Sequence, residues 1–211
     1  MIKFENTEVF NFDGAIRGMR NPLNSWDKSD SGYYNQCDEC YSLMDYHIGP
    51  NDLALMKKLI KAGSDHRKFM RQILVSVDIT APLYWWKEFD TYKVGTVSNS
   101  CSTMHNIHSK PIELSDFSID GDTYLDRFED IVLDCEALRK LYLMTKDKKY
   151  WRALIQLLPS SYNQRRTITL NYETLLNIYG SRRNHKLDEW SIGFMNWIES
   201  LPYANELIID R

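Results

Sequence analysis

The longest periodic stretch of the sequence, residues 121–146, constrains the fold more than any other feature. Apolar side chains recur along one side of it at helical spacing, from Tyr124 to Met144, and acidic residues occupy the other side. The segment KKYWRALIQLLP follows at once and predicts a shorter helix that ends before Pro159. We therefore expect a long helical region over residues 121–158.

Three segments predict β-strands. Residues 2–10 alternate loosely between apolar and polar side chains, ILVSVDITA alternates with β-branched residues, and TITLNYE is a third strand. The polar, glycine-containing segment LNSWDKSDSGYYNQ predicts a long loop, and Asn51 or Asp52 is expected to cap the helix that begins near Pro50. The other segments that predict helices are DGAIRGMR, Cys37 to Tyr46, PNDLALMKKLIKA, DHRKFMRQ, PLYWWKEF, LLNIYGSR and LDEWSIGFMNWIESL.

This order of segments predicts an α+β fold. Strands and helices follow one another without a regular βαβ alternation, and no glycine-rich fingerprint is present, so a Rossmann sheet is disfavoured. The 211 residues fit a single domain, 1–211, that can bury a real core. We expect the LYWW aromatic cluster to belong to that core, and the long helix to contribute to the core and to an oligomer interface.

Composition and charge exclude several classes of partner. The net charge of -3 argues against general electrostatic attraction to nucleic acid. The segment MIKFENTEVF lacks the apolar core of a signal peptide, and no apolar run approaches the roughly 20 residues of a membrane helix. We therefore expect a cytoplasmic protein with no membrane partner.

The cysteines and histidines give only weak signs of a metal site. Cys37 and Cys40 form the one close pair, CDEC, which is compatible with zinc or redox chemistry but is more often a pair of reduced structural thiols. His105 and His108 are spaced similarly and lack further ligands nearby. We expect no metal.

Residues 91–105, TYKVGTVSNSCSTMH, place many hydroxyl groups directly after the aromatic segment APLYWWKEF. Such composition is typical of a connecting loop. It also suits a pocket wall, in which hydroxyl and backbone N–H groups meet a phosphate or a ring carbonyl. Both interpretations remain open from these residues alone.

Three blocks occur in order: GAIRGMRNPLNSW, ILVSVDITAPLYWWKEFDTYKVGTVSNSCSTMH and LLPSSYNQRRTITLNYETLLNIYGSRRNHKLDEW. Together they resemble the flavin-dependent thymidylate synthases. GAIRGMRNPLNSW is similar to the family's early helix, with Arg17 and Arg20 at its paired arginines. Arg17 and Arg20 lie one helical turn apart, so we expect both to face one pocket. The strand ILVSVDITAP and the segment after it match the family's strand and signature motif in position. This resemblance implies a small, mostly antiparallel sheet packed with helices.

The third block, LLPSSYNQRRTITLNYETLLNIYGSRRNHKLDEW, carries the most specific matches. It places Asn171, Arg182, His185 and Glu189 at positions where the family has the same residue types. Glu173, by contrast, stands where the family has an arginine two residues after the asparagine. The resemblance covers the whole chain in the order of its blocks.

The signature motif itself departs from the family pattern. Its Arg-His-Arg becomes Thr91, Tyr92 and Lys93, and Met104-His105 stands where Arg-Tyr is expected. Lysine keeps the charge of an arginine but loses the planar fork that grips a phosphate with two bonds. If a nucleotide binds, neutral hydrogen bonds have to replace some of the missing cations. The residues that fit this role are Thr91, Thr96, Ser98, Ser100 and Ser102, while Asn99 matches the motif's asparagine.

The resemblance implies the reductive methylation of dUMP or a related pyrimidine deoxynucleotide. FAD would be the cofactor, methylenetetrahydrofolate and NADPH the co-substrates, and a homotetramer the assembly. In such an enzyme the flavin carries the difficult chemistry and no protein nucleophile is needed, so Cys101 is better explained as a small packing residue. The alternative, favoured by the altered motif, is an inactive protein of the same fold that binds nucleotides or partners.

The implied roles divide among twelve residues. Arg182, whose counterpart holds and polarises the pyrimidine, and Ser102 are the candidate catalytic residues. The candidate cofactor-binding residues are Asn171, His185, Lys93, Tyr92, Thr96 and Asn99. The candidate substrate-binding residues are Arg17, Arg20, Ser100, Ser102, Arg165 and Arg182.

Overall fold

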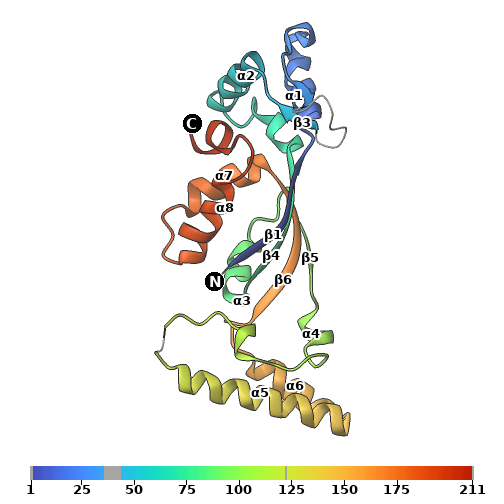
Figure 1. The fold of residues 1–211 in the computed structure, drawn as a ribbon, viewed down its shortest axis with the longest axis vertical. Coiled ribbons are helices and arrows are strands. Elements are labelled where there is room, and N and C mark those ends of the chain that lie inside the picture. Colours follow the sequence, from blue (N-terminus) through green and yellow to red (C-terminus); the bar gives the residue numbers. More distant parts are fainter. Residues whose placement is uncertain (1, 36–43, 122, 211) are drawn as a thin grey trace. The chain divides into compact units, whose positions relative to one another are not determined.

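The computed structural model describes residues 2–35, 44–121 and 123–210 (Figure 1). Its strands are β1 Lys3–Phe10, β2 Gly32–Asn35, β3 Met44–His47, β4 Leu74–Pro82, β5 Val97–Ser100 and β6 Asn163–Asn171. Its helices are α1 Phe12–Arg20, α2 Pro50–Lys61, α3 Leu83–Phe89, α4 Thr103–Asn106, α5 Leu125–Thr145, α6 Lys148–Leu157, α7 Tyr172–Arg182 and α8 Met195–Glu199.

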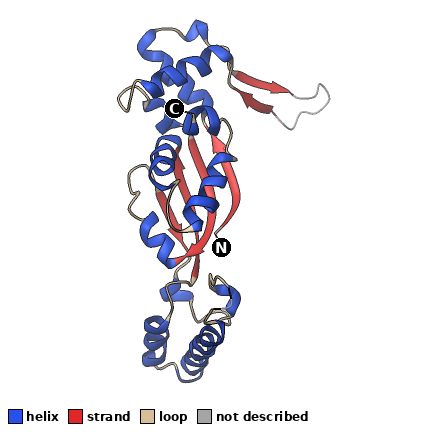
Figure 2. Cartoon of the chain, turned by 90° about the vertical axis from the view of Figure 1, so that its left-hand side faces the viewer, coloured by secondary structure: helices blue, strands red, loops and turns tan. Residues whose placement is uncertain are grey.

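The strands form one main sheet and one small hairpin. The main sheet has the strand order β1-β4-β6-β5, and β2 pairs antiparallel with β3 from Gly32 opposite His47 to Asn35 opposite Met44 (Figure 2). Many helices accompany this small antiparallel sheet, so the predicted α+β class is confirmed.

Contacts divide the chain into two compact units, which we describe separately. The single domain expected over residues 1–211 stays a prediction. The first unit comprises Met1–Glu5, Asp78–Thr91 and Ser98–Thr167, and the second unit comprises Asn6–Val77, Tyr92–Val97 and Ile168–Arg211.

The paired helices α5 and α6 form the core of the helical part of the first unit (Figure 1). Val132 and Cys135 of α5 are buried there with Leu154 of α6. The helical region is therefore confirmed, with helices over Leu125–Thr145 and Lys148–Leu157. Tyr124 and Met144, expected on the apolar side, are exposed, because Tyr124 precedes the first turn of α5 and Met144 lies in its last turn.

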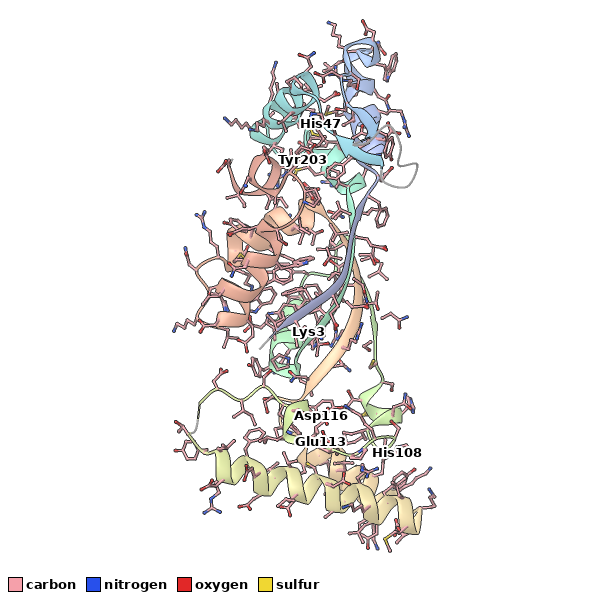
Figure 3. The ribbon with its side chains drawn as sticks, in the orientation of Figure 1. Lys3, His47, His108, Glu113, Asp116 and Tyr203 are labelled. Atoms are coloured by element: carbon pink, nitrogen blue, oxygen red, sulfur yellow. The ribbon has the colours of Figure 1, made fainter. Side chains whose placement is uncertain are left out.

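A partly buried ion pair within α5 also bonds to the segment before the helix. Both Nε and Nη2 of Arg139 donate to the carboxylate of Glu136, at 2.6 and 2.7 Å, and Nη1 donates to the backbone oxygen of His108. The N–H of Ile112 donates to the same carboxylate at 3.0 Å. The bonds from Arg139 lower the pKa of Glu136 to about 2. Figure 3 labels His108 together with Glu113 and Asp116, the two residues of the capping box at the turn Leu114–Asp116.

The aromatic cluster of α3 is part of the core of the first unit, as expected. Trp85, Trp86 and Phe89 are almost completely buried, and the two indole rings meet edge to face with centroids 4.9 Å apart. The indole N–H of Trp86 donates to the backbone oxygen of Gln164 at 2.9 Å, which satisfies a buried polar group.

Helix α7 forms much of the core of the second unit. Its residues Leu175, Leu176 and Ile178 are completely buried, and Tyr172 donates its hydroxyl hydrogen to the backbone oxygen of Pro202. Nearby in the same unit the hydroxyl of Tyr203, labelled in Figure 3, accepts the N–H of Ile48 at 2.8 Å.

The start of α2 differs from the prediction. Gly49, not Asn51 or Asp52, is the capping position, and the carboxylate of Asp30 accepts the N–H groups of both expected caps. Asp52 is fully buried, where its carboxylate accepts a 2.6 Å hydrogen bond from Nε of Arg20. A distant aspartate therefore caps the helix, which local sequence could not reveal.

Two further expectations failed in the segment before α2. The predicted loop LNSWDKSDSGYYNQ contains the 3-10 turn Trp26–Lys28 and the strand β2. In the helix expected from Cys37 to Tyr46, the described residues from Met44 onward belong to strand β3. Residues 36–43, and with them Cys37 and Cys40, lie outside the described residues.

Candidate functional site

A pocket of about 430 Å³ in the first unit brings Ser102 and Arg165 together. Its wall begins where β5 ends: the N–H of Cys101 donates to the backbone oxygen of Arg165 at 3.0 Å. The side chain of Gln164 also bonds to this segment: its Nε2 donates to the backbone oxygen of Cys101 at 2.9 Å and to Oγ1 of Thr103 at 3.0 Å. The lining residues are Thr80, Cys101, Ser102, Thr103, Asn106, Ile107, Ser109, Lys110, Ser115, Asp116, Tyr162, Asn163, Gln164 and Arg165.

The charged groups of this pocket are all paired. Lys110 and Arg165 contribute two cations to the lining and Asp116 contributes one anion, and Arg165 also pairs with Asp78 and Glu5, so no positive charge is left in excess. Nζ of Lys110 contacts Asp116 at 2.5 Å, and Nη2 of Arg165 contacts Asp78 at 2.8 Å. Ser102 caps α4, with Oγ accepting the N–H of His105. The pocket suits a polar ligand.

Asn99, Ser100 and Arg166 of the first unit are not among the lining residues of this pocket. Asn99 and Ser100 lie in β5, whose four residues are all exposed. Arg166, next to Arg165, pairs with Asp90 at 2.7 Å and lies over the ring of Trp86 with its guanidinium carbon 4.2 Å from the centroid. The guanidinium of Arg166 therefore already has an ionic and an aromatic partner within the first unit.

Arg182, in the second unit, lies against two aromatic rings. Its Nε donates to the hydroxyl oxygen of Tyr92 at 2.8 Å, and its guanidinium carbon is 4.9 Å from the ring centroid of Trp190 and 5.5 Å from that of Tyr92. Trp190 is completely buried and Arg182 is half-buried. A guanidinium held over aromatic faces is fixed in direction, unlike a solvated arginine at a helix end.

His185 belongs to the same aromatic cluster. Its ring centroid is 6.3 Å from that of Trp190, and its Nδ1 accepts the N–H of Leu187 at 3.1 Å. Three predicted residues, Tyr92, Arg182 and His185, therefore surround Trp190. The sequence interpretation did not single out this tryptophan, although its place in the apolar pattern of LDEWSIGF predicts burial.

The loop of residues 92–96 rests on the first turn of α7. Asn171 caps this helix, its Oδ1 accepting the N–H of Thr174 at 3.0 Å, and the hydroxyl of Thr174 donates to the backbone oxygen of Val94 at 3.2 Å. Gly95 has φ of 73°, and a Cβ there would lie 2.6 Å from Nδ2 of Asn171. Only glycine combines this backbone angle with so close an approach.

Two side chains of this loop have capacity for a ligand. Lys93 is exposed. Oγ1 of Thr96 is buried and has no hydrogen-bond partner among the residues that the structure describes. A buried hydroxyl without a partner is costly, so a ligand that bonds to it gains accordingly.

Comparisons with known proteins agree with this geometry at the level of the fold. No family model and no curated protein sequence matches the chain. The crystal structure of Thymidylate Synthase X (ThyX) from Helicobacter pylori with FAD and dUMP matches over 100% of both chains, with a TM-score of 0.73 and 16% identity. A second Helicobacter pylori structure, flavin-dependent thymidylate synthase ThyX complexed with FAD and dUMP, matches over 98% of both chains, with a TM-score of 0.69 and 16% identity.

The chain has the flavin-dependent thymidylate synthase fold. The fold implied by the order of the three sequence blocks is thus confirmed over the full length of the chain. The matching structures include FAD and dUMP, and those ligands belong to the Helicobacter pylori proteins.

Within this flavin-dependent thymidylate synthase fold, Arg17 and Arg20 have different surroundings. Arg17 is exposed and paired with Asp13, whereas Arg20 is buried against Asp52. A second pocket, of about 570 Å³, includes Arg20 in its lining and does not include Arg17. A shared role for the two arginines toward a substrate stays a prediction. The other lining residues are Leu23, Ser25, Lys28, Asn51 and Leu55.

Glu173, which replaces an arginine of the family pattern, is buried in the first turn of α7. Its carboxylate accepts hydrogen bonds from Nε of Arg67, at 3.1 Å, and from Nε of Arg71. Burial by itself would raise the pKa of Glu173, but the bonds from Arg71 and Arg67 outweigh it and hold the pKa below its usual value. Glu173 is therefore ionised at neutral pH.

Among the described residues, no helix is both long enough and apolar enough to span a membrane. No group of histidine, cysteine, aspartate and glutamate side chains in the described ranges could hold a metal ion.

Proposed function

We propose that the chain is a divergent FAD-dependent thymidylate synthase. It would methylate dUMP, or a related pyrimidine deoxynucleotide, with methylenetetrahydrofolate as the carbon donor and NADPH as the reductant. The observation that carries the proposal is the position of Arg182, which is half-buried and held by Tyr92 and Trp190. Fixing a guanidinium in this way costs side-chain entropy and suits a group that has to meet a ligand in one orientation.

The residues of the second unit fit a flavin nucleotide. The buried hydroxyl of Thr96 offers an unused hydrogen bond, and exposed Lys93 offers a cation on the same loop. Asn171 and His185 complete the set of residues that would hold the cofactor, together with Tyr92 as a ring-stacking partner. When bound, FAD supplies the redox chemistry of the methyl transfer.

The chain's own residues would bind and polarise the pyrimidine nucleotide. Arg182 would direct its guanidinium at a ring carbonyl and stabilise the negative charge that develops when the ring is attacked. Ser102 and Arg165, which line the pocket of the first unit, stay candidate substrate-binding residues on the strength of the resemblance. Ser100, Arg17 and Arg20 stay candidate substrate-binding residues.

An inactive nucleotide-binding protein is the second candidate function. It is supported by Met104, which is exposed where the family has an arginine, and whose backbone oxygen accepts the indole N–H of Trp151 at 2.9 Å. Methionine has no charge, so this position cannot supply the positive charge that the family's arginine supplies. The two candidates differ in whether the bound nucleotide is turned over.

A homotetramer, as in other proteins of the resembled family, is part of the same proposal. Exposed apolar side chains, among them Leu133 and Met144 of α5, support association with further copies of the chain. Sedimentation velocity at micromolar concentration tests it, and a monomer at all concentrations would contradict it.

The absorption spectrum of the purified protein tests the proposal most directly. An enzyme of this type is expected to be yellow, or to gain thermal stability with FAD and then further with dUMP. Production of dTMP from dUMP, methylenetetrahydrofolate and NADPH then separates the enzyme from the inactive binder. A colourless protein that neither nucleotide stabilises would reject both candidates.

A further inference from the structure

Arg71 is one of two arginines that Glu173 holds at the start of α7. Arg67 directly precedes the 3-10 turn Lys68–Gln72 and Arg71 lies within it, and each uses Nε to reach the same carboxylate. Glu173 is 9% exposed, whereas the side chain of Arg71 is 53% exposed. A buried anion therefore fixes one edge of a guanidinium whose other edge faces solvent.

The two arginines use their remaining donors differently. Nη2 of Arg67 donates to Oδ1 of Asn177 at 3.4 Å. Nη1 and Nη2 of Arg71 have no hydrogen-bond partner in the described part of the chain. Two adjacent N–H donors in one plane match two oxygens of a phosphate group.

The charges around Arg71 leave a small positive excess. Residues 65–71 and Glu173 together contribute three cations, Arg67, Lys68 and Arg71, and two anions, Asp65 and Glu173. Glu173 lies in the first turn of α7, where the helix dipole favours anions. The loop of residues 92–96, with exposed Lys93, contacts the same first turn through Asn171 and Thr174. The two arginines and the loop that includes Lys93 thus contact the same helix start.

We propose that Arg71, positioned by Glu173, is a phosphate-binding residue for a nucleotide. The inference rests on the proposed function, because it assigns one more residue to the binding of its ligands. The glutamate at position 173 reverses the charge expected there, and the paired arginines restore a cation from another segment. The phosphate could come from the diphosphate of FAD or from dUMP, and the experiment distinguishes them.

The first experiment compares Arg71→Ala with Lys68→Ala. Both variants remove one exposed positive charge from the same turn, but only Arg71 is bonded to Glu173. Affinities for FAD, riboflavin, dUMP and inorganic pyrophosphate are measured by calorimetry at low and high salt. We expect Arg71→Ala to weaken binding of FAD or of dUMP at least tenfold, and Lys68→Ala to change it less than threefold.

The pattern of losses identifies the source of the phosphate. A loss for FAD but not for riboflavin or dUMP assigns Arg71 to the cofactor diphosphate, and a loss for dUMP assigns it to the substrate. Equal affinities of Arg71→Ala and the unaltered protein for FAD, dUMP and pyrophosphate would overturn the inference. If the unaltered protein binds neither nucleotide, the proposed function fails, and pyrophosphate alone decides: binding that Arg71→Ala loses supports the site, and no binding overturns it.

The positioning role of Glu173 needs its own readout. Glu173→Gln leaves two arginines without their anion, and its folding is checked by circular dichroism. We expect it to lower FAD or dUMP affinity while riboflavin affinity stays the same, which a merely structural role would not produce. Should Glu173→Gln fail to fold, Arg71→Lys provides the test, because lysine keeps the positive charge but lacks the planar guanidinium that donates two parallel hydrogen bonds. Phosphate binding by Arg71→Lys that equals the unaltered protein would contradict a bidentate contact.

Discussion

Arg182 and Tyr92 are joined by a 2.8 Å hydrogen bond from the guanidinium Nε to the phenol oxygen. The bond connects the last turn of α7 with a residue ninety positions earlier in the chain, within the second unit. It restricts the guanidinium to one plane, against the buried ring of Trp190. The first two predictions follow from this restriction.

Arg182→Ala is expected to abolish uracil-nucleotide binding or to lower turnover by about 100-fold or more, because charge that develops on the ring loses its counter-charge. Steady-state kinetics and calorimetry with dUMP measure the effect. Arg183→Ala is the matched control, since Arg183 is exposed and adjacent to it. Unchanged turnover in Arg182→Ala would reject the assignment.

Tyr92→Phe is expected to lower turnover about tenfold, because it removes the hydrogen bond to Arg182 while keeping the ring beneath it. The measurement is kcat and KM for dUMP in the variant. Thermal stability should change little, since Tyr92 is half-buried and keeps its ring. A loss of stability without a loss of turnover would show that the bond serves only the fold.

Gly95→Ala is expected to destabilise the protein by more than Gly121→Ala. The two glycines have similar φ angles, 73° and 70°, so both variants carry a backbone cost of about 1–2 kcal/mol. Only at Gly95 would the new Cβ also meet Asn171, whereas at Gly121 none of the described residues lies within 4 Å of it. Urea denaturation compares the two. If both variants lose the same free energy of unfolding, the contact between the new Cβ and Asn171 has no energetic cost.

Asn171→Ala is expected to lower the free energy of unfolding by about 1 kcal/mol, because α7 loses its capping acceptor. Asn171→Asp keeps that acceptor and should retain most of the stability. The aspartate variant loses the amide donor, so FAD affinity measured by flavin fluorescence separates capping from ligand binding. Full FAD affinity in Asn171→Asp would remove Asn171 from the cofactor-binding set.

Stability should fall in acid through Glu136. Its pKa lies at about 2, below the ordinary value of 4.5, because the Arg139 guanidinium bonds to it. A lowered pKa stabilises the folded state above pH 4.5, and that contribution, on the order of 2–3 kcal/mol, is lost as the pH falls from 4.5 toward 2. Urea denaturation between pH 2 and 6 measures it. Glu136→Gln should flatten this dependence, and Glu129→Gln, at an exposed position of the same helix, should not.

Long periodic segments were predictable from sequence because their pattern alone fixes them. Helix α5 and strand β4 are examples: β4 alternates between buried and half-buried residues along its length. Strand β5 was not predicted, since its residues VSNS are all exposed and have the composition of a loop. Strand β2 depends on its pairing with β3, which no local pattern encodes.

The candidate site was predictable only in part, for the same physical reason. Ser102 and Arg165 lie in one pocket, and Tyr92 meets Arg182, as the resemblance would allow. The partners that fix these residues, Trp190 above all, are distant in sequence and are selected by tertiary packing. The bonds from Arg67 and Arg71 to Glu173 likewise join residues about a hundred positions apart.

The close approach of Gly95 to Asn171 has a consequence for protein engineering. A library that randomises residues 92–96 to change ligand preference is expected to be more stable on average when glycine is kept at position 95. Variation at positions 93 and 96 avoids both the backbone cost and the contact with Asn171.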